Sequence, residues 1–361
     1  MAIKIVFTGG GTAGHVTPNI ALIEALKQEN WSVEYIGSAN SIEQYMIGSM
    51  AIPFHVISSG KLRRHLSLQN VLTPFLVIKG IWQAYFLLKK LNADVVFSKG
   101  GFVSFPVVVA AWLNRLPIMA HESDLTPGLA NQMSFPFVDT LCVTFKLAKQ
   151  SMRYQKKIKV TGTPIRENLF QGSRERGLNI CNFRADKPCI LVIGGSQGAQ
   201  SINTAIRQAL PQLLNNYQVI HICGKGKLDE TCSSQGYKQF AFVEQELAHL
   251  FAASDLVISR AGANTLYEIL ALQKPHILIP LSRESSRGDQ IQNASYFAAQ
   301  DISYVIDDNR LDNTTLCTAI EAVFANKNSI IEKIQTLGIH SATVNIIKLL
   351  KQAVASSKKV V

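Results

Sequence analysis

The stretch "KIVFTGGGTAGHVTPN", from Lys4 to Asn19, carries the signal for the fold. An apolar strand runs directly into a glycine-rich turn, and a helix-forming segment follows the turn. Gly9, Gly11 and Gly14 match the G-x-G-x-x-G spacing that, after a strand, is typical of dinucleotide-binding domains. The stretch therefore predicts a Rossmann-like unit. It leaves open which phosphate the turn holds and why His15 stands where the helix begins.

Glycine-rich turns recur in both halves of the chain. They are "GGGTAG" (9–14), "KGG" (99–101), "GGSQGA" (194–199) and "AGAN" (261–264), and each follows a strand-like run. Strand-like runs that alternate with helix-length segments predict parallel sheets with helices on both faces. With 361 residues available, we expect an α/β protein of two Rossmann-like domains. The boundary is predicted near Thr163–Arg166, where "TGTP" breaks the pattern.

A redox function is weakened by the second strand of the first domain. A dinucleotide dehydrogenase needs an acidic residue at the end of that strand to bind a ribose. Here the strand "SVEYIGS" ends in Gly37 and Ser38, and Glu34 lies within it. Two facing domains with glycine turns at helix starts would instead enclose a cleft for two phosphorylated substrates, one per domain.

The composition bears on partners and compartment. The formal net charge is +11, and basic residues cluster at 61–65 and 146–166, which suits nucleic acid, an anionic membrane or phosphorylated substrates. No zinc-finger or RNA-binding signature accompanies the clusters, so nucleic acid is the weakest of these. The six cysteines show no C-x-x-C spacing, which indicates reduced thiols and no zinc site. We also expect no signal peptide.

The segment "LSLQNVLTPFLVIKGIWQAYFLLKK" (66–90) is strongly apolar, but Pro74 and Lys79 interrupt it as a membrane span. Two interpretations stay open. It is an ordinary buried helix, or its outer face enters a lipid interface beside the basic residues Lys61, Arg63 and Arg64.

Several motifs together resemble one family. "TGGGTAGHVTPN", "SKGGFVSFP", "HESDLTPGLAN", "TGTPIRE", "GGSQGAQSIN", "SRAGANTLYE" and "SRGDQIQNA" occur in this order over essentially the whole chain. The set resembles the MurG family, which adds N-acetylglucosamine to the lipid-linked muramyl-pentapeptide of peptidoglycan synthesis. "HESDLTPGLAN" and "SRGDQ" are similar to the form common in Gram-positive bacteria.

The resemblance implies a GT-B glycosyltransferase fold with a deep cleft between the domains. Residues 1–163 would take the acceptor, undecaprenyl-diphosphate-linked N-acetylmuramyl-pentapeptide, and associate with the membrane. Residues 164–361 would bind UDP-N-acetylglucosamine, with a return of the last helix to the first domain left open. The reaction would invert the anomeric centre without a metal or other cofactor. No D-x-D motif occurs, and Asp307–Asp308 resembles a surface turn.

The resemblance also implies the donor site. Ser196 would face the diphosphate, Glu268 would hold the uridine ribose, and Gln290 would bind sugar hydroxyls. The other donor-binding positions are Arg166, Val243, Ala263, Asn264, Thr265 and Leu266.

On the acceptor side, Thr12, Ala13 and Gly14 would line the floor of the cleft near the acceptor diphosphate. Ala13 stands where the family has glycine, so it requires ordinary backbone angles or mild strain there. The attacking 4-hydroxyl must lose a proton, and a histidine with a pKa near the working pH suits that task. His15 is the candidate base. Asp124 is the alternative base, or it contacts the donor sugar.

Three other functions stay open at this point. The first is a glycosyltransferase of the same fold that uses a diacylglycerol acceptor. The second is an NAD-dependent oxidoreductase, and the third is a lipid-binding module without catalysis. We expect the protein on the cytoplasmic face of the cell membrane, bound peripherally to an anionic surface and not to nucleic acid.

Overall fold

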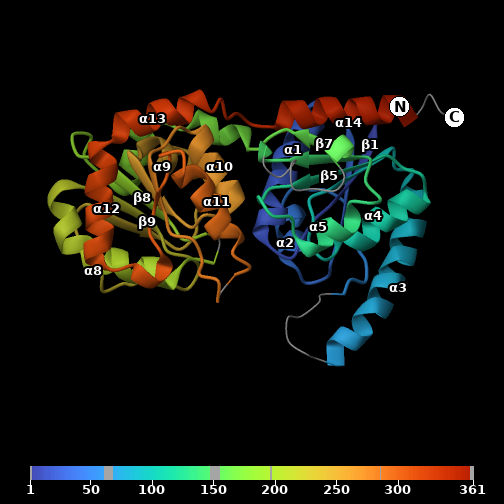
Figure 1. Ribbon diagram of the computed structural model, residues 1–361, viewed down its shortest axis with the longest axis horizontal. Coiled ribbons are helices and arrows are strands. Elements are labelled where there is room, and N and C mark those ends of the chain that lie inside the picture. Colours follow the sequence, from blue (N-terminus) through green and yellow to red (C-terminus); the bar gives the residue numbers. More distant parts are fainter. Residues whose placement is uncertain (1, 61–67, 147–154, 196, 285, 358–361) are drawn as a thin grey trace. The chain divides into compact units, whose positions relative to one another are not determined.

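The computed structural model describes residues 2–60, 68–146, 155–195, 197–284 and 286–357. The chain forms two compact units. Unit 1 contains residues 1–166 together with 341–361, and unit 2 contains residues 167–340. The boundary expected from the sequence, 163/164, lies three residues before the first crossing between the units. Figure 1 shows both units along the chain.

Unit 1 is built on a parallel sheet of seven strands in the order β3-β2-β1-β4-β5-β6-β7. The strands are β1 (Lys4–Thr8), β2 (Ser32–Gly37), β3 (Phe54–Val56), β4 (Val95–Ser98), β5 (Ile118–Glu122), β6 (Thr140–Val143) and β7 (Ile158–Val160). The strand order reverses between β1 and β4, which pair directly. In parallel α/β sheets a crevice opens at the carboxyl ends of such strands.

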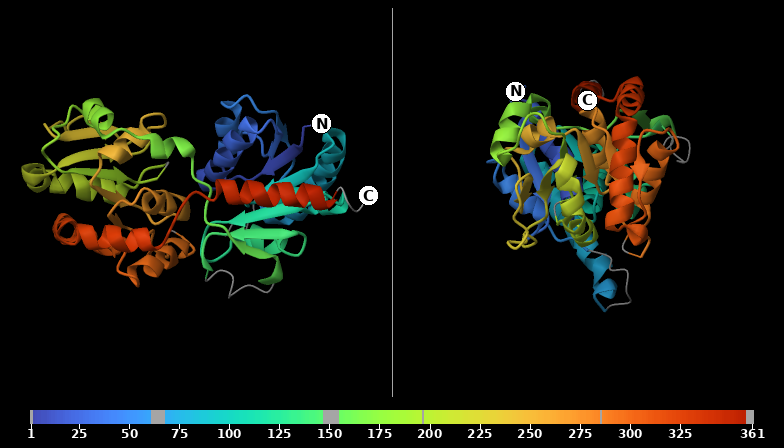
Figure 2. Two further views of the ribbon diagram at one scale, coloured as in Figure 1. Left: turned by 90° about the horizontal axis from the view of Figure 1, so that it is seen from above. Right: turned by 90° about the vertical axis from the view of Figure 1, so that its left-hand side faces the viewer.

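Helices cover this sheet. They are α1 (Thr17–Gln28), α2 (Ile42–Gly48), α3 (Leu68–Leu91), α4 (Ser104–Leu113), α5 (Leu129–Ser134) and α14 (Thr343–Ser357), with one-turn helices η1 (Ala13–His15) and η2 (Gln155–Lys157). The last helix, α14, packs against α1, and Ile346 and Leu350 are buried with Leu22 in one apolar cluster. Figure 2 shows α14, in red, along the sheet of unit 1. Residues from the two ends of the chain thus share one core.

The segment after β7, the last strand of unit 1, is hydrogen-bonded to the segment that precedes α14. The Ser341 hydroxyl accepts from the Ile165 backbone N–H at 3.1 Å and lies 3.0 Å from the Ile165 carbonyl oxygen. The Ala342 N–H donates to the Thr163 carbonyl at 3.1 Å. The segments on the unit 1 side of the two crossings are therefore hydrogen-bonded to each other.

Unit 2 holds a parallel sheet of six strands in the order β10-β9-β8-β11-β12-β13. The strands are β8 (Cys189–Ile193), β9 (Gln218–Ile222), β10 (Tyr237–Phe240), β11 (Leu256–Ser259), β12 (His276–Leu278) and β13 (Tyr304–Val305). Its helices are α7 (Arg174–Cys181), α8 (Gln200–Asn216), α9 (Leu247–Ala253), α10 (Ala263–Ala271), α11 (Asp289–Ala298), α12 (Asn313–Ala325) and α13 (Lys327–Thr336), with η3 (Glu167–Gln171) and η4 (Asp308–Arg310). The same reversal of strand order occurs here between β8 and β11.

The expected α/β class with two Rossmann-like domains is confirmed. The sequence also predicts a strand at "FAFV" (240–243), but β10 ends at Phe240, so the last three residues of that run lie in the following loop. Within the described residues no helix is long and apolar enough to cross a membrane.

Candidate functional site

The loops after β1 and β4 meet at the reversal point of unit 1. The Gly10 N–H donates to the Gly100 carbonyl at 3.2 Å. A Cβ on Gly101 would stand 2.1 Å from the Gly10 oxygen, so a side chain at this position would separate the two loops. Gly11 has a φ of +86° and a Cβ there would stand 2.8 Å from the Phe102 ring. The motif glycines thus serve loop-to-loop contact at the carboxyl edge of the sheet.

His15 ends η1, and Val16, the N-cap of α1, follows it. Its Nδ1 lies 2.9 Å from the Gly10 carbonyl oxygen and 3.3 Å from the Thr12 hydroxyl. Because a carbonyl oxygen only accepts, Nδ1 carries the proton in this bond, and in the neutral form of the ring Nε2 is then the unprotonated nitrogen. Ala13 lies in η1 outside the positive-φ residues. The ordinary backbone angles expected of it are therefore found. Thr12 and Gly14 are exposed.

The loop after β5 is organised by a buried carboxylate. Glu122 accepts from the N–H groups of Asp124 (3.0 Å) and Gly128 (3.1 Å) and from the Asn131 amide at 2.8 Å. Asp124 is half-buried beside it. These bonds set the backbone that presents Asp124.

Lys99, at the end of β4, is a functional candidate that the sequence interpretation missed. Its side chain is fully enclosed and donates to the Ser123 hydroxyl at 2.8 Å. Burial lowers the pKa of Lys99, and the carboxylates of Glu122 and Asp124 offset part of that shift. Its position directly before the glycine pair of "SKGG" was a signal in the sequence that a cation lies at this sheet edge.

Glu34 is engaged away from the loops. Its Oε2 lies 2.8 Å from the His55 Nε2 on the neighbouring strand β3. The acidic residue that a dinucleotide-binding domain offers to a ribose is therefore tied up within the sheet, which agrees with the weakened redox interpretation.

In unit 2, α10 carries the predicted donor residues Ala263, Asn264, Thr265, Leu266 and Glu268. Glu268 is 9% exposed, whereas Asn264, one turn earlier, is half-buried. Gln290 lies in the first turn of α11, and its Oε1 accepts from the Leu281 N–H at 3.1 Å. That bond orients the side-chain amide toward the loop after β12.

The remaining predicted positions are spread more widely. Val243 lies in the loop after β10 and is buried. Arg166 is grouped with unit 1, where it lowers the pKa of Glu24 on α1 against the larger raising effect of burial. Ser196, Lys61, Arg63 and Arg64 lie outside the described residues. Their predicted roles have no structural account here.

A buried arginine that the sequence interpretation missed organises the edge of the unit 2 sheet. Arg260, after β11, donates to the Ile279 carbonyl (3.0 Å) and to the Ser201 hydroxyl (2.9 Å) and pairs with Asp308 at 2.9 Å. Ser201 also donates to Asp308 at 2.7 Å. The expectation that Asp308 belongs to a plain surface turn is wrong, because its carboxylate balances this enclosed guanidinium.

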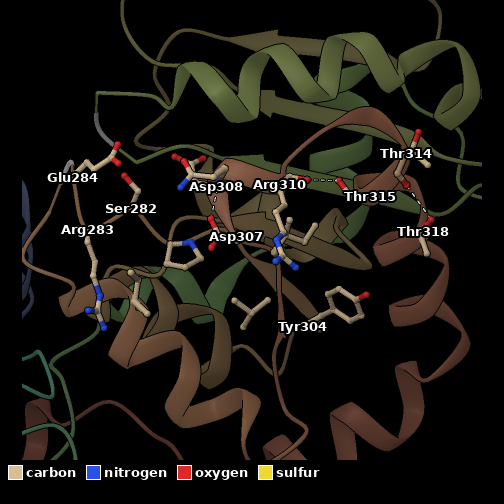
Figure 3. A pocket seen from close by; sticks show the side chains of 15 residues that line it. Ser282, Arg283, Glu284, Tyr304, Asp307, Asp308, Arg310, Thr314, Thr315 and Thr318 are labelled. Carbon is tan, nitrogen blue, oxygen red and sulfur yellow. Dashed lines mark hydrogen bonds between the residues drawn. The ribbon is translucent and has the colours of Figure 1, made fainter.

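A cavity of about 810 Å³ opens beside Asp308. Figure 3 shows its wall, with Arg283 and Glu284 from the loop after β12, Tyr304 on β13, and Arg310 and Thr314 near α12. None of the predicted site residues lines it. The cavity therefore does not contain the candidate donor residues.

No metal centre is evident in the parts of the chain that the structure describes, where no group of three or more His, Cys, Asp or Glu side chains could hold an ion.

Comparison with known proteins identifies the family. Residues 5–143 match the glycosyltransferase family 28 N-terminal domain, and residues 189–350 match the corresponding C-terminal domain. A UDP-N-acetylglucosamine–N-acetylmuramyl-(pentapeptide) pyrophosphoryl-undecaprenol N-acetylglucosamine transferase of Legionella pneumophila strain Paris is 59% identical, over 98% of this chain and 97% of its own. The chain belongs to the MurG family of N-acetylglucosamine transferases.

Other members and solved structures agree. The relative of the same name from Lachnoclostridium phytofermentans is 51% identical over 97% of this chain and 98% of its own. The crystal structure of Acinetobacter baumannii MurG superposes with a TM-score of 0.76 at 23% identity, over 97% and 99% of the two chains. The calicheamicin glycosyltransferase CalG4 has a TM-score of 0.71 at 13% identity, over 98% of each chain. The fold is thus that of GT-B glycosyltransferases, and the MurG family includes relatives from both Legionella and clostridial species.

The Arg260–Asp308 pair yields a test of this architecture. Asp308→Ala leaves an enclosed guanidinium without its carboxylate, and we expect it to lower the free energy of unfolding by about 2 kcal/mol. Urea denaturation followed by circular dichroism measures the change. Asp301→Ala, which breaks the exposed pair with Lys333, is the matched control and should have a much smaller effect. Equal effects of the two variants would contradict the structural role of Asp308.

Proposed function

We propose that the protein transfers N-acetylglucosamine from UDP-N-acetylglucosamine to the 4-hydroxyl of undecaprenyl-diphosphate-linked N-acetylmuramyl-pentapeptide, in the synthesis of peptidoglycan. The observation that carries the proposal is membership of the MurG family along nearly the whole chain, in both domains. Unit 1 takes the acceptor and unit 2 takes the donor.

The donor is held at the carboxyl edge of the unit 2 sheet. Glu268 accepts hydrogen bonds from the ribose hydroxyls, and Gln290, with its Oε1 held by Leu281, offers its amide NH₂ to the sugar. The first turns of α8 and α10 direct backbone N–H groups and the positive ends of their dipoles toward the diphosphate. Arg166, Val243 and the Ser196 loop complete the contacts with the nucleotide.

The chemistry is a single displacement with inversion. The acceptor O4 attacks the anomeric carbon, its proton passes to the Nε2 of His15, and the bond from that carbon to the UDP oxygen breaks. A neutral ring suits a base here, because when Nδ1–H donates to the Gly10 carbonyl the lone pair of the neutral imidazole is on Nε2. Charge on the departing UDP is stabilised by the helix N-termini, without a metal.

Membrane association is assigned to α3. Phe75, Ile78, Trp82 and Phe86 occupy one face of this helix, and they are 68, 53, 57 and 62% exposed. The face is called the α3 apolar face below. Exposed Lys79, Lys89 and Lys90 flank it, so apolar contact and attraction to anionic lipid act together. The protein would bind peripherally to the cytoplasmic surface of the membrane, where both substrates are available.

A transfer assay tests the function. The protein is mixed with UDP-N-acetylglucosamine and a synthetic muramyl-pentapeptide diphosphate lipid, and both UDP release and the disaccharide product are measured. We expect turnover with this acceptor and none with diacylglycerol. Turnover with diacylglycerol alone would favour the glycolipid alternative. Absence of UDP release with either acceptor, together with saturable NADH binding, would favour the oxidoreductase.

Replacement of His15 tests the assignment of the base. His15→Ala and His15→Gln should each lower kcat by about 100- to 10,000-fold with an unchanged donor dissociation constant. The acidic limb of the pH–rate profile, which reports protonation of His15, should disappear. Glu268→Ala is the control with the opposite signature, because it should raise the donor KM while kcat changes little. If Gln restores most of the activity, His15 only positions the loop and Asp124 becomes the next candidate.

Membrane binding is tested on the α3 apolar face. Trp82→Glu combined with Phe86→Glu should weaken binding to phosphatidylglycerol vesicles at least about 10-fold, since each buried aromatic contributes about 1.5–3 kcal/mol. Cosedimentation measures binding, which should also fall with added salt. Val344→Glu, at a residue 76% exposed on α14, is the control. Unchanged binding of the double variant would exclude this face as the membrane contact.

A further inference from the structure

A carboxylate is enclosed beneath the first glycine loop of unit 1. Glu43, in the first turn of α2, is fully buried. Its Oε2 accepts from the Gly11 N–H at 3.1 Å, and its Oε1 accepts from the Ser38 hydroxyl at 2.6 Å and the Ser38 N–H at 3.3 Å. A Cβ on Gly10 would stand 2.3 Å from the carboxyl group. Gly10, between the first two glycines of the G-x-G-x-x-G motif, therefore makes room for a carboxylate of the protein itself.

One peptide unit connects this carboxylate to the histidine. The Gly10 carbonyl and the Gly11 N–H belong to the same planar amide. The N–H side of that amide donates to Glu43, and the carbonyl side accepts from the Nδ1–H of His15 at 2.9 Å. Hydrogen bonds in series polarise one another, so a negative acceptor on the N–H makes the carbonyl a stronger acceptor. The effect is largest where water is excluded, as it is around Glu43.

We infer that Glu43 is a positioning residue for the transfer reaction and acts on His15 through the Gly10–Gly11 peptide. It holds the amide in the orientation that receives Nδ1–H, and it strengthens that acceptor. The histidine is thereby kept in the tautomer whose Nε2 holds the lone pair. The arrangement resembles a carboxylate–histidine pair with one peptide unit inserted. Partners that orient a metal-bound histidine change activity about 10- to 100-fold when lost, and we expect an effect of that size here.

The chemistry requires a carboxylate at this position. Glu43 meets donors on both oxygens, two from Ser38 and one from Gly11. A glutamine has one acceptor and one donor end. If its oxygen serves Ser38, its NH₂ faces the Gly11 N–H, and if it is turned over, the NH₂ faces the Ser38 donors. Glu43→Gln therefore conserves the side-chain volume but cannot keep all the hydrogen bonds that connect residue 43 to Ser38 and, through the Gly10–Gly11 peptide, to His15.

The test uses the full-length protein and rests on the proposal that His15 is the base. Imidazole-¹⁵N histidine labels all eight histidines, and the His15 signal is assigned by its absence in His15→Gln. In the wild type we expect Nδ1 protonated and Nε2 unprotonated. In Glu43→Gln we expect a mixture of tautomers, a kcat lowered about 10- to 100-fold and an unchanged donor KM.

Controls separate this role from a general loss of structure. Glu34→Gln removes a carboxylate from the same sheet, where it pairs with His55, and should leave both the tautomer and kcat unchanged. Glu43→Asp keeps the charge but withdraws it from Gly11, and should shift the tautomer in the same direction as Glu43→Gln. A wild-type tautomer in both Glu43 variants, or an unchanged kcat, would overturn the inference. Full activity of His15→Gln would instead contradict the assignment of His15 as the base. The nitrogen spectra would then still show whether Glu43 controls the tautomer of His15.

Discussion

The arrangement of the site residues in unit 1 depends on the contact between the glycine loops after β1 and β4, where the strand order reverses. Gly101 can approach the Gly10 carbonyl only without a side chain. With the loops in contact, the Gly10–Gly11 amide lies between α2 and His15. Its N–H donates to Glu43, and its carbonyl accepts from His15. The same loop is held from the sheet side, where the Tyr35 hydroxyl donates to the Gly9 carbonyl at 2.6 Å. The loop is thus held by hydrogen bonds to α2, to His15 and to the sheet.

Buried charges organise both units through short-range partners. Lys99 has Ser123 with Glu122 and Asp124 nearby. Glu43 accepts from the N–H groups of Gly11 and Ser38 and from the Ser38 hydroxyl. Arg260 has Asp308 with a carbonyl and a hydroxyl. A charge removed from water is stable only when its partners are placed accurately. Each such group therefore holds a loop at the carboxyl edge of its sheet. Preorganised loops suit a transferase in which helix dipoles and amides stabilise the leaving diphosphate.

Much of this fold could be predicted from local sequence. β2 has the bounds that its apolar run indicated, and the glycine turns mark the loops at the sheet edges. What could not be predicted depends on contacts between distant residues. Glu43 looks like a solvated charge at a helix start, and its burial follows only from the glycine above it. Asp308 looked like part of a turn because Arg260, its partner, is 48 positions earlier in the chain. Val243 likewise lies in the loop after β10 because the pairing of β10 with β9 stops at Phe240.

The return of α14 to unit 1 gives the chain an order of assembly. Unit 2 is continuous from 167 to 340, whereas unit 1 lacks Ile346 and Leu350 until the final residues exist. On a ribosome, unit 2 can therefore complete its core while unit 1 still exposes the apolar side of α1. A prematurely ended chain would carry an intact unit 2 attached to an unfinished unit 1, a product suited to recognition by chaperones or proteases. Completion of the unit 1 core is thereby coupled to synthesis of α14.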